Sequence, residues 1–246
     1  MAIQQPIAFF DFDGTLTYVT CLHQLLLIRR ELSSGWTEWM WYVTFCLRIP
    51  IFYILYKRDP TLFNNYYFRE FTGFDTQQVK NSITNRVVPF LRCAVFSDAE
   101  QEIKSLKKKG YRIILISASL REVIEPVAQS LGIHDFIATE LAVADGKYSG
   151  HIQGDCIDNH VKAMKIKAFI KERGLSLVDS VGYGNSRGDI PMLETVSRSI
   201  VINPDKRLRR WANRKKCAIK NWPRPAVPCL RIYFSDKFKI EMNNHP

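Results

Sequence analysis

The chain has 246 residues, of which 46% are hydrophobic and 24% are charged. This length and composition exclude an intrinsically disordered chain and suit one large domain, or a domain that carries an insert. The formal net charge of +11 predicts an anionic partner, and composition alone leaves nucleic acid, an acidic membrane and phosphorylated substrates open. Six dispersed cysteines without a CxxC pair favour reduced thiols in the cytoplasm over a zinc site or a disulfide framework.

Short apolar runs predict the strands of a buried sheet. The first run, 7–10, leads directly into Asp11 and Asp13. Further strands are expected over 111–116, 177–181 and 199–202, with two short strands within 136–148 around the Asp145-Gly146 turn. Helices are expected between them over 97–109 (opened by a Ser97/Glu100 capping box), 120–131, 161–173 and 190–195. This alternation predicts an α/β fold: a Rossmann-like parallel sheet with helices on both faces.

One block interrupts the alternation. Residues 19–90 are helical in pattern, rich in aromatic residues and poor in strand and turn signals. We therefore expect a helical cap inserted after the first strand. The expected division of the chain is an α/β core of 1–18 and 91–204, a cap of 19–90 and a basic C-terminal extension of 205–246, irregular beyond Pro223.

Polar side chains follow three of the expected strands. Asp11 and Asp13 follow the first strand, Ser117 follows the second, and Asn185 and Asp189 follow the third. Ligands of open α/β sheets bind at the carboxyl ends of the strands, so these groups are expected to meet there. Carboxylate and amide oxygens suit a hard cation, which favours Mg²⁺. A serine and a helical lysine, Lys162, would suit the oxygens and charge of a phosphate group.

Four ordered segments resemble the motifs of the haloacid dehalogenase-like phosphatases. The run Asp-Phe-Asp-Gly-Thr-Leu-Thr over 11–17 is similar to the first motif. Ser117 matches the second, Lys162 the third, and Gly-Asn-Ser-Arg-Gly-Asp over 184–189 resembles the fourth. The spacing from Asp145-Gly146 to Lys162 is similar to that of the phosphoserine-phosphatase-like branch, subfamily IB. In that branch a helical C1 cap lies between the first and second motifs, where the 19–90 block falls.

The resemblance implies a role for each motif residue. Asp11 would be the nucleophile that forms an aspartyl-phosphate, and Asp13 the general acid and base. Ser117 and Lys162 would bind the phosphoryl group together with Gly14, with Ser119 as an alternative to Ser117. The implied mechanism is positioning plus electrostatic stabilisation, as in other phosphoryl transfers.

The implied cofactor is Mg²⁺, held by Asp11, Asp13, Asn185 and Asp189. The family's fourth motif usually carries an aspartate where this chain has Asn185. An asparagine still offers a carbonyl oxygen, but one ligand charge is lost. This substitution bears on metal affinity more than on the type of reaction.

The cap departs from the phosphoserine phosphatases as well. Those enzymes carry a glutamate nine residues after the nucleophile, where this chain has Thr20. Thr20 and Arg48 are the candidate substrate-contacting residues of the cap. The aromatic stretch 36–56 contains Arg48 as its one basic residue, with Pro50 close by, which predicts a kink. Two interpretations stay open for it: a helix that lies in a membrane interface, or the buried core of the cap.

The positive charge is concentrated near the C-terminus. Residues 206–224 contain nine basic residues and no acidic residue, bracketed by Trp211 and Trp222. This composition is typical of a solvated helix face, and it also suits an acidic bilayer. Phosphates of nucleic acid could be bound in the same way, but the chain has no recognised motif that reads RNA or DNA.

These observations lead to one principal hypothesis and two alternatives. The principal one is a Mg²⁺-dependent phosphomonoester hydrolase acting on a lipid phosphate such as phosphatidylglycerophosphate, since some phosphatases of that lipid belong to the same branch. It would act in the cytoplasm, peripheral to the cytoplasmic face of a membrane through 36–56 and 206–224. The alternatives are a soluble phosphatase of a small, phosphoserine-like metabolite and a non-catalytic binding protein on the same fold.

Overall fold

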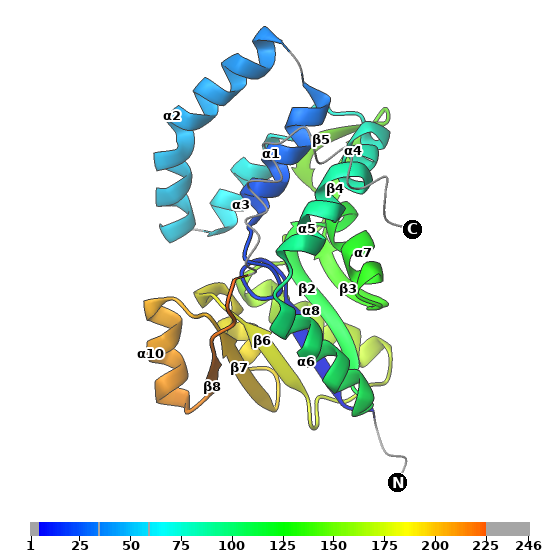
Figure 1. Ribbon diagram of the computed structural model, residues 1–246, viewed down its shortest axis with the longest axis vertical. Coiled ribbons are helices and arrows are strands. Elements are labelled where there is room, and N and C mark those ends of the chain that lie inside the picture. The colour runs from blue at the N-terminus through cyan, green and yellow to red at the C-terminus, as the bar shows by residue number, and fades with distance from the viewer. Residues whose placement is uncertain (1–4, 34, 59, 225–246) are drawn as a thin grey trace.

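The fold is built on a six-stranded parallel sheet (Figure 1). A computed structural model of the chain describes residues 5–33, 35–58 and 60–224. The strand order is β3-β2-β1-β6-β7-β8, and all neighbours are parallel. The strands are β1 (Ile7–Asp11), β2 (Arg112–Leu120), β3 (Asp135–Thr139), β6 (Val181–Gly184), β7 (Arg198–Ile202) and β8 (Ala218–Lys220). The expected parallel α/β sheet is confirmed.

Helices cover both faces of the sheet because the central strand is apolar on both sides. Ala8 and Phe10 of β1 belong to one hydrophobic cluster, and Ile7 and Phe9 belong to the other. The first cluster includes residues of α6 (Ser97–Lys108) and α7 (Arg121–Ser130). The second includes residues of α8 (Asn159–Glu172), α9 (Ile190–Leu193) and α10 (Lys206–Lys215).

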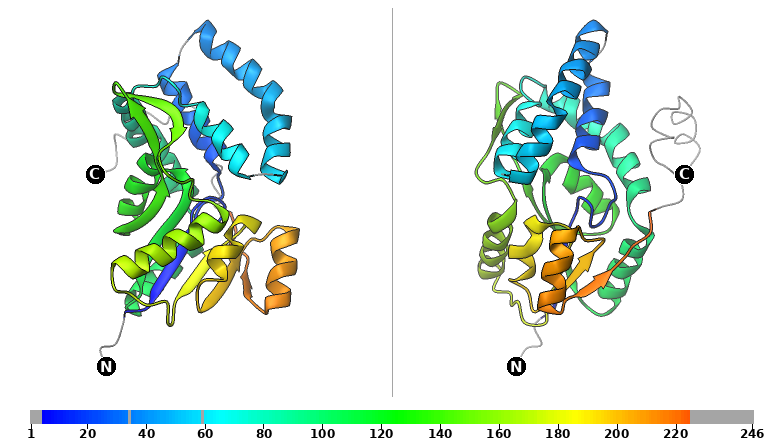
Figure 2. Two further views of the ribbon diagram at one scale, coloured as in Figure 1. Left: turned by 180° about the vertical axis from the view of Figure 1, so that it is seen from behind. Right: turned by 90° about the vertical axis from the view of Figure 1, so that its left-hand side faces the viewer.

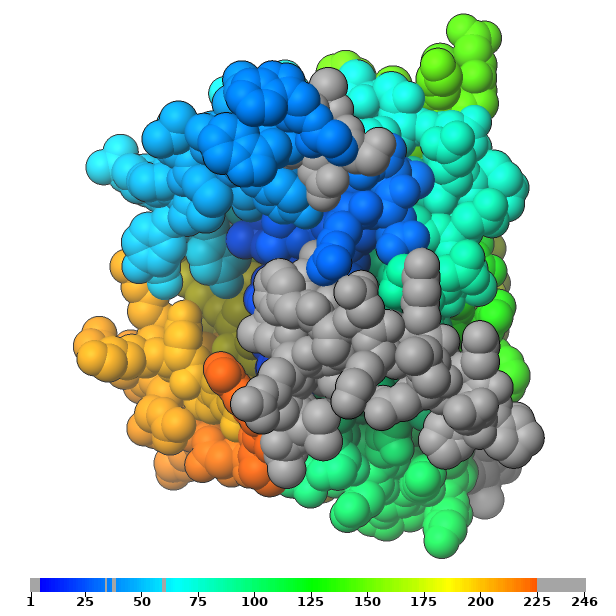
Figure 3. Space-filling model, turned by 45° about the horizontal axis from the view of Figure 1, so that its top comes forward, coloured from blue at the N-terminus to red at the C-terminus, as the bar shows by residue number. Residues whose placement is uncertain are grey.

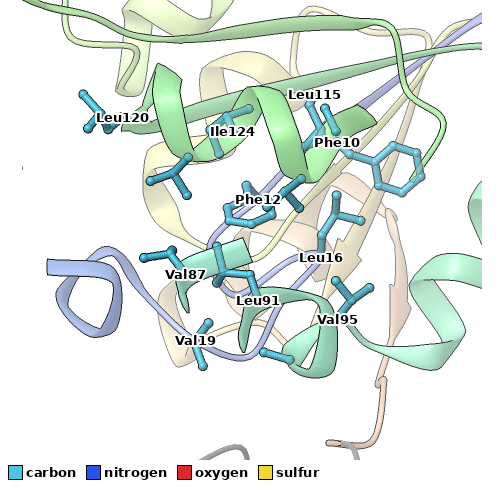
Figure 4. Close-up of a cluster of buried hydrophobic side chains, with 14 of the residues drawn as sticks. Phe10, Phe12, Leu16, Val19, Val87, Leu91, Val95, Leu115, Leu120 and Ile124 are labelled. Atoms are coloured by element: carbon cyan, nitrogen blue, oxygen red, sulfur yellow. The ribbon is translucent and has the colours of Figure 1, made fainter. Parts of the chain in front are cut away.

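A helical cap lies between β1 and β2 in the sequence, as expected. Its elements are α1 (Cys21–Leu32), α2 (Trp36–Arg58), α3 (Pro60–Arg69), α4 (Thr76–Ser82), a π-helical turn (Ile83–Val87) and α5 (Val88–Ala94). Figure 4 shows the base of the cap: Leu91 of α5 and Leu16 of the loop after β1 lie close to Phe12. These residues belong to the same hydrophobic cluster as one face of the sheet. Cap and core therefore share a continuous interior on this side.

The hairpin expected around Asp145-Gly146 is present. It joins β4 (Leu141–Ala144) to the antiparallel β5 (Lys147–Ile152), and both turn residues have positive φ angles of 51° and 73°. The expectation of only two strands within 136–148 is wrong, because Phe136 lies in β3 and pairs with Leu115 of the main sheet. A sheet strand and a hairpin strand follow each other there with only Glu140 between them.

The strand expected over 177–181 lies further along the chain, at β6. Leu177 begins a turn instead, in which the Ser180 amide donates to its carbonyl and Asp179 has a φ of 58°. The two glycines of β6 interrupt the apolar run that would have predicted this strand from the sequence. A Cβ at Gly182 would lie 3.0 Å from Val196 Cγ2, and one at Gly184 would lie 2.6 Å from Asp189 Cβ. The close packing of the following segment leaves no room for a side chain at Gly184 and little room at Gly182.

Two boundaries also differ from expectation. The residue before α6 is Phe96, and no side chain caps this helix, so the Ser97/Glu100 capping box is not formed. Glu100 forms an ion pair with Arg92 at 3.2 Å instead. At the other end, β8 pairs with β7 and continues the sheet. The core therefore extends beyond residue 204, into the expected basic extension, whereas the irregular part expected at 225–246 lies outside the described residues.

Candidate active site

A buried cluster of three charged side chains lies at the carboxyl edge of the sheet. Lys162 Nζ, from the first turn of α8, donates to Asp11 Oδ1 and to Asp189 Oδ1, both at 2.6 Å. Asp11 ends β1, and Asp189 ends a short 3-10 turn that follows β6. Because β1 and β6 are parallel neighbours, their carboxyl ends meet and bring these residues together. All three side chains are at least nine-tenths buried.

Asp189 has a second set of contacts that fixes the loop after β6. Its Oδ2 accepts from the Asn185 amide at 3.1 Å, from the Ser186 amide at 2.9 Å and from Ser186 Oγ at 3.0 Å. With Lys162 on Oδ1, both oxygens are engaged by donors of the protein. Asp189 therefore contacts Lys162 and the 185–186 backbone through both oxygens, and its assignment as a metal ligand stays a prediction.

Asp13 is held by two donors from different parts of the fold. Ser119 Oγ of β2 donates to Oδ2 at 2.5 Å, and Gln24 Nε2 of the cap helix α1 donates to Oδ1 at 3.0 Å. Ser117 lies beside them and accepts from the Ser119 amide at 3.0 Å. The structure thus separates the two serines: Ser119 contacts Asp13, and Ser117 does not.

The first turn after β1 needs glycine. Gly14 has a φ of 82°, which L side chains rarely adopt, and a Cβ there would lie 2.1 Å from Asn185 Nδ2. Thr15 Oγ1 donates to Asp11 Oδ2 at 2.8 Å and also lies 3.3 Å from Asn185 Oδ1. The first and fourth motifs therefore touch through Gly14, Thr15 and Asn185.

Burial and charge shift the titration of the catalytic candidates. Burial, and then the charge of Asp189, raise the pKa of Asp11 to about 7 against the opposing effect of Lys162. Burial raises the pKa of Asp13 to about 6, although the hydrogen bond from Ser119 lowers it. Burial lowers the pKa of Lys162, but its two carboxylate partners outweigh burial and raise it overall. Asp13 therefore has a pKa suited to a group that gives and takes a proton near neutrality.

The charge balance of the cluster favours a cation. Lys162 pairs with Asp11 and Asp189 while Asp13 lies without a lysine partner of its own among the described residues, and a phosphate ester would add further negative charge. Within the described residues, no three His, Cys, Asp or Glu side chains form a metal-binding group. The predicted ligands, which are Asp11, the Asp13 carbonyl, Asn185 and Asp189, would offer a cation oxygen atoms only. Such hard oxygen donors fit Mg²⁺, with a lower ligand charge than a site built from three carboxylates.

The two cap candidates make contacts within the cap. Thr20 caps α1, with His23 Nδ1 at 3.2 Å from both its amide nitrogen and its Oγ1. Arg48 pairs with Glu70 at 2.6 Å and borders a cavity of about 230 Å³ between α2 and α3.

Gln24 of the cap helix α1 reaches the catalytic cluster, and the sequence interpretation missed it. It is 1% exposed, and its Oε1 has no hydrogen-bond partner among the described residues. A glutamine on the apolar face of a helix, next to Leu25, Leu27 and Ile28, is the signal that could have identified it.

Fold and site together define a capped α/β enzyme with carboxylates and a lysine at the carboxyl ends of its parallel strands. The chain belongs to the haloacid dehalogenase-like hydrolase family, whose model matches residues 8–194. The resemblance inferred from the four motifs, including its phosphoserine-phosphatase-like branch, is confirmed.

The proteins of similar sequence carry several different enzyme names. A probable phosphatase of Mycobacterium tuberculosis is 32% identical over 151 residues, which are 61% of this chain and 50% of that protein. The chain thus matches about half the length of that relative. A histidinol-phosphatase of Neisseria meningitidis is 27% identical, over 88% of this chain and 98% of its own.

Solved structures share the fold at low identity. A Bordetella pertussis protein of unknown function aligns with a TM-score of 0.75 at 23% identity, over 88% of this chain and 98% of its own. A phosphoserine phosphatase in a phospho-aspartyl intermediate analogue form aligns with a TM-score of 0.66 at 20% identity, over 96% of this chain and 99% of its own.

Proposed function

We propose that this chain is a Mg²⁺-dependent phosphomonoester hydrolase that works through an aspartyl-phosphate on Asp11. The observation that carries the proposal is the buried contact of Lys162 with Asp11 and Asp189, beside an Asp13 held by its own donors. A non-catalytic binding protein would not need this complete set. Lys162 has three N–H donors, of which two hold the carboxylates, so the third can reach a phosphoryl oxygen.

The first half of the reaction transfers the phosphoryl group to the protein. A carboxylate oxygen of Asp11 attacks phosphorus, and the bond from phosphorus to the ester oxygen breaks. Asp13 gives its proton to that leaving oxygen, so an alcohol departs. Lys162, Ser117 and the amide groups around Gly14 hold the phosphoryl oxygens in line with the attacking carboxylate.

The second half releases inorganic phosphate. Asp13, now ionised, takes a proton from a water molecule that attacks phosphorus, and the bond between phosphorus and Asp11 breaks. Ser119 and Gln24 keep the Asp13 carboxyl in one place through both halves. Mg²⁺ held by Asp11, the Asp13 carbonyl, Asn185 and Asp189 would supply the positive charge that lets two anions approach each other.

The proposed substrate is a phosphate monoester on a lipid, such as phosphatidylglycerophosphate. Two features support it: Thr20 stands where phosphoserine phosphatases carry an amine-binding glutamate, and helix α2 exposes large apolar side chains. A small phosphorylated metabolite is the second candidate, favoured by relatives named phosphoserine phosphatase and histidinol-phosphatase. We propose a cytoplasmic location, with the enzyme peripheral to a membrane in the lipid case.

A phosphate-release screen tests both levels of the proposal. Phosphatidylglycerophosphate, phosphoserine, histidinol phosphate and p-nitrophenyl phosphate are compared with and without Mg²⁺. Asp11→Asn is expected to lose at least about 1,000-fold in kcat, since the nucleophile is removed. The exposed Asp145→Asn is the matched control and should keep full activity. Full Mg²⁺-dependent turnover by Asp11→Asn would refute the mechanism, whereas turnover of the soluble esters alone would refute the lipid substrate.

A further inference from the structure

Helix α2 exposes apolar side chains over most of its circumference. One stripe faces the cap, where Phe45 and Phe52 are buried. The large apolar residues outside this stripe are exposed: Trp36, Trp39, Met40, Val43, Leu47, Ile49, Ile51, Tyr53, Ile54 and Tyr56. A helix that is apolar on all sides normally lies inside a protein or in contact with lipid. The buried-cap interpretation therefore accounts for the inner stripe, and it leaves the outer face without a partner among the residues that the structure describes.

The contacts of α2 with the rest of the cap bear on whether this helix would cross a membrane or lie in its interface. By length and composition the segment 39–58 could cross one, and only 11% of it is buried. However, Trp41 Nε1 donates to Glu70 at 2.7 Å and Arg48 pairs with the same carboxylate at 2.6 Å. Phe52 also packs edge-on against Phe63 of α3. Because one side of α2 is fastened along the cap, the helix can lie in a membrane interface with its outer side immersed, and it need not leave the fold.

The basic helix α10 supplies a complementary charged surface. Its apolar residues Leu208, Trp211 and Ala212 are buried against the sheet, so its basic residues face outwards. The exposed basic residues are Lys206, Arg207, Arg209, Arg210, Arg214 and Lys215. Residues 39–58 of α2 contain three basic residues and no acidic residue. Both helices therefore suit an anionic surface.

The two helices lie on the same side of the molecule. α2 and α10 both occupy the left side of Figure 1, the right side of the view from behind, and the near side of the turned view in Figure 2. Figure 3 again shows α2 and α10 along one side. In the turned view the chain just after β1, which carries the catalytic turn, lies between them.

We propose that α2 and α10 form one docking face for an anionic lipid bilayer, with α2 in the interface and α10 over the charged headgroups. The inference deepens the proposed function, since it names the partner of the same enzyme. The docking face places the chain just after β1, which carries the catalytic turn, on the side that would face the membrane and its lipid phosphates. Basic residues near such a surface contribute roughly a five-fold gain in binding each.

Vesicle flotation of the full chain tests the proposal. Vesicles of phosphatidylglycerol mixed with phosphatidylcholine are compared with pure phosphatidylcholine at low and high salt. Leu47→Glu/Ile54→Glu changes one outer side of α2, where the residues are 73% and 52% exposed. Arg207→Gln/Arg210→Gln/Arg214→Gln changes α10. The matched control is Met164→Glu/Val178→Glu. These apolar residues are 63% and 70% exposed, but they belong to the α/β core domain and lie outside α2 and α10.

We expect salt-sensitive binding to the anionic vesicles only, reduced roughly 100-fold by either set of changes and unaffected in the control. Turnover of p-nitrophenyl phosphate by the same variants should be unchanged. Asp11→Asn should lose turnover and keep full binding, which separates failure of docking from failure of the proposed chemistry. Absence of binding to both vesicle types would overturn the inference. So would a dimer that Leu47→Glu/Ile54→Glu dissociates without loss of vesicle binding, because α2 would then cover a second copy of the chain.

Discussion

Asn185 is the residue at which this site departs from the usual family motif. Its side chain lies against Gly14 and 3.3 Å from Thr15 Oγ1, so an aspartate of the same shape would occupy the same space. Asn185→Asp adds a ligand charge and should lower the Mg²⁺ dissociation constant about ten-fold. Calorimetric titration with Mg²⁺ measures this directly, with Asn213→Asp on exposed α10 as the control. An unchanged dissociation constant would remove Asn185 from the proposed metal site.

We expect Gln24 to act as a positioning residue for the Asp13 carboxyl, and one substitution can test this role. Its Nε2 donates to Asp13, whereas its buried Oε1 has no partner among the described residues. Gln24→Leu should therefore leave stability nearly unchanged, because the removal of an unsatisfied buried oxygen offsets the loss of the donor to Asp13. The same change should lower kcat about ten-fold or more with little effect on KM, since Asp13 loses a donor.

Urea unfolding and steady-state kinetics measure the two effects on one protein sample. Gln129→Leu, on the exposed side of α7, is the matched control and should alter neither. A purely structural role for Gln24 would instead appear as a loss of stability with normal kcat.

Sequence reasoning brought together Asp11, Asp13, Lys162 and Asp189 because strand ends and motif order determine their positions. It could not place Gln24, since the angle at which a cap helix meets the core leaves no spacing signal in the chain. It also could not tell how many donors Asp189 engages, because backbone amides of the 185–186 turn supply two of them.

At the scale of elements, β2 and β3 are joined by an ion pair that should give the fold a pH dependence. Arg112 donates to both oxygens of Asp135 at 2.7 and 2.8 Å, and Arg173 adds a contact at 3.1 Å. Hydrogen bonds from Arg112 lower the pKa of Asp135 against the opposing effect of burial. A lowered pKa means that the ionised form stabilises the folded state above the unfolded pKa, and that this contribution is lost as pH falls through the folded value.

Asp135→Asn should therefore cost about 1–3 kcal/mol at pH 7, and the difference from wild type should shrink steadily below about pH 4. Urea unfolding at a series of pH values measures it. Asp145→Asn, in the exposed hairpin turn, serves as the control and should cost little at any pH. If the difference in unfolding free energy between the variant and wild type stays constant down to pH 3, Asp135 stabilises the fold through its shape and not through its charge.

The elements that sequence reasoning misplaced share a physical cause. Strand β6 contains two glycines, and glycine adds nothing to an apolar sequence pattern. The same glycines are needed in the structure, because the segment after β6 packs closely against them. Strand β8 follows a strongly basic helix, so its short apolar content was attributed to an extension. Its pairing with β7 is a long-range contact that periodicity cannot reveal.

For the whole molecule, the β4–β5 hairpin fastens the cap to the core. The Gly73 amide donates to the Tyr148 carbonyl at 2.8 Å, and the Tyr148 amide donates to the Phe74 carbonyl at 2.9 Å. The Thr76 amide adds a third bond, to the Gly146 carbonyl at 2.9 Å. Because α1 of the same cap carries Gln24 to Asp13, the hairpin contributes to the geometry of a site to which it supplies no side chain.

Gly150 of β5 is the position where this attachment is tightest. Its φ is 77°, and a Cβ there would lie 2.0 Å from Thr72 Oγ1 and 3.1 Å from Arg69 Cα. Gly154 has the same φ of 77° but nothing within 4 Å of a Cβ, so it is a matched control for backbone strain alone. Gly154→Ala should cost about 1–2 kcal/mol, and Gly150→Ala about 1–3 kcal/mol more because it also presses against the cap.

Urea unfolding gives the free energies, and kinetics with p-nitrophenyl phosphate report on the site. Displacement of the cap should withdraw Gln24 from Asp13, so Gly150→Ala should lower kcat several-fold while Gly154→Ala leaves it unchanged. Equal losses of unfolding free energy for the two variants would mean that Thr72 and Arg69 can move away from the new Cβ without further loss of stability. In that case the three backbone hydrogen bonds of the hairpin would be sufficient to hold the cap in place.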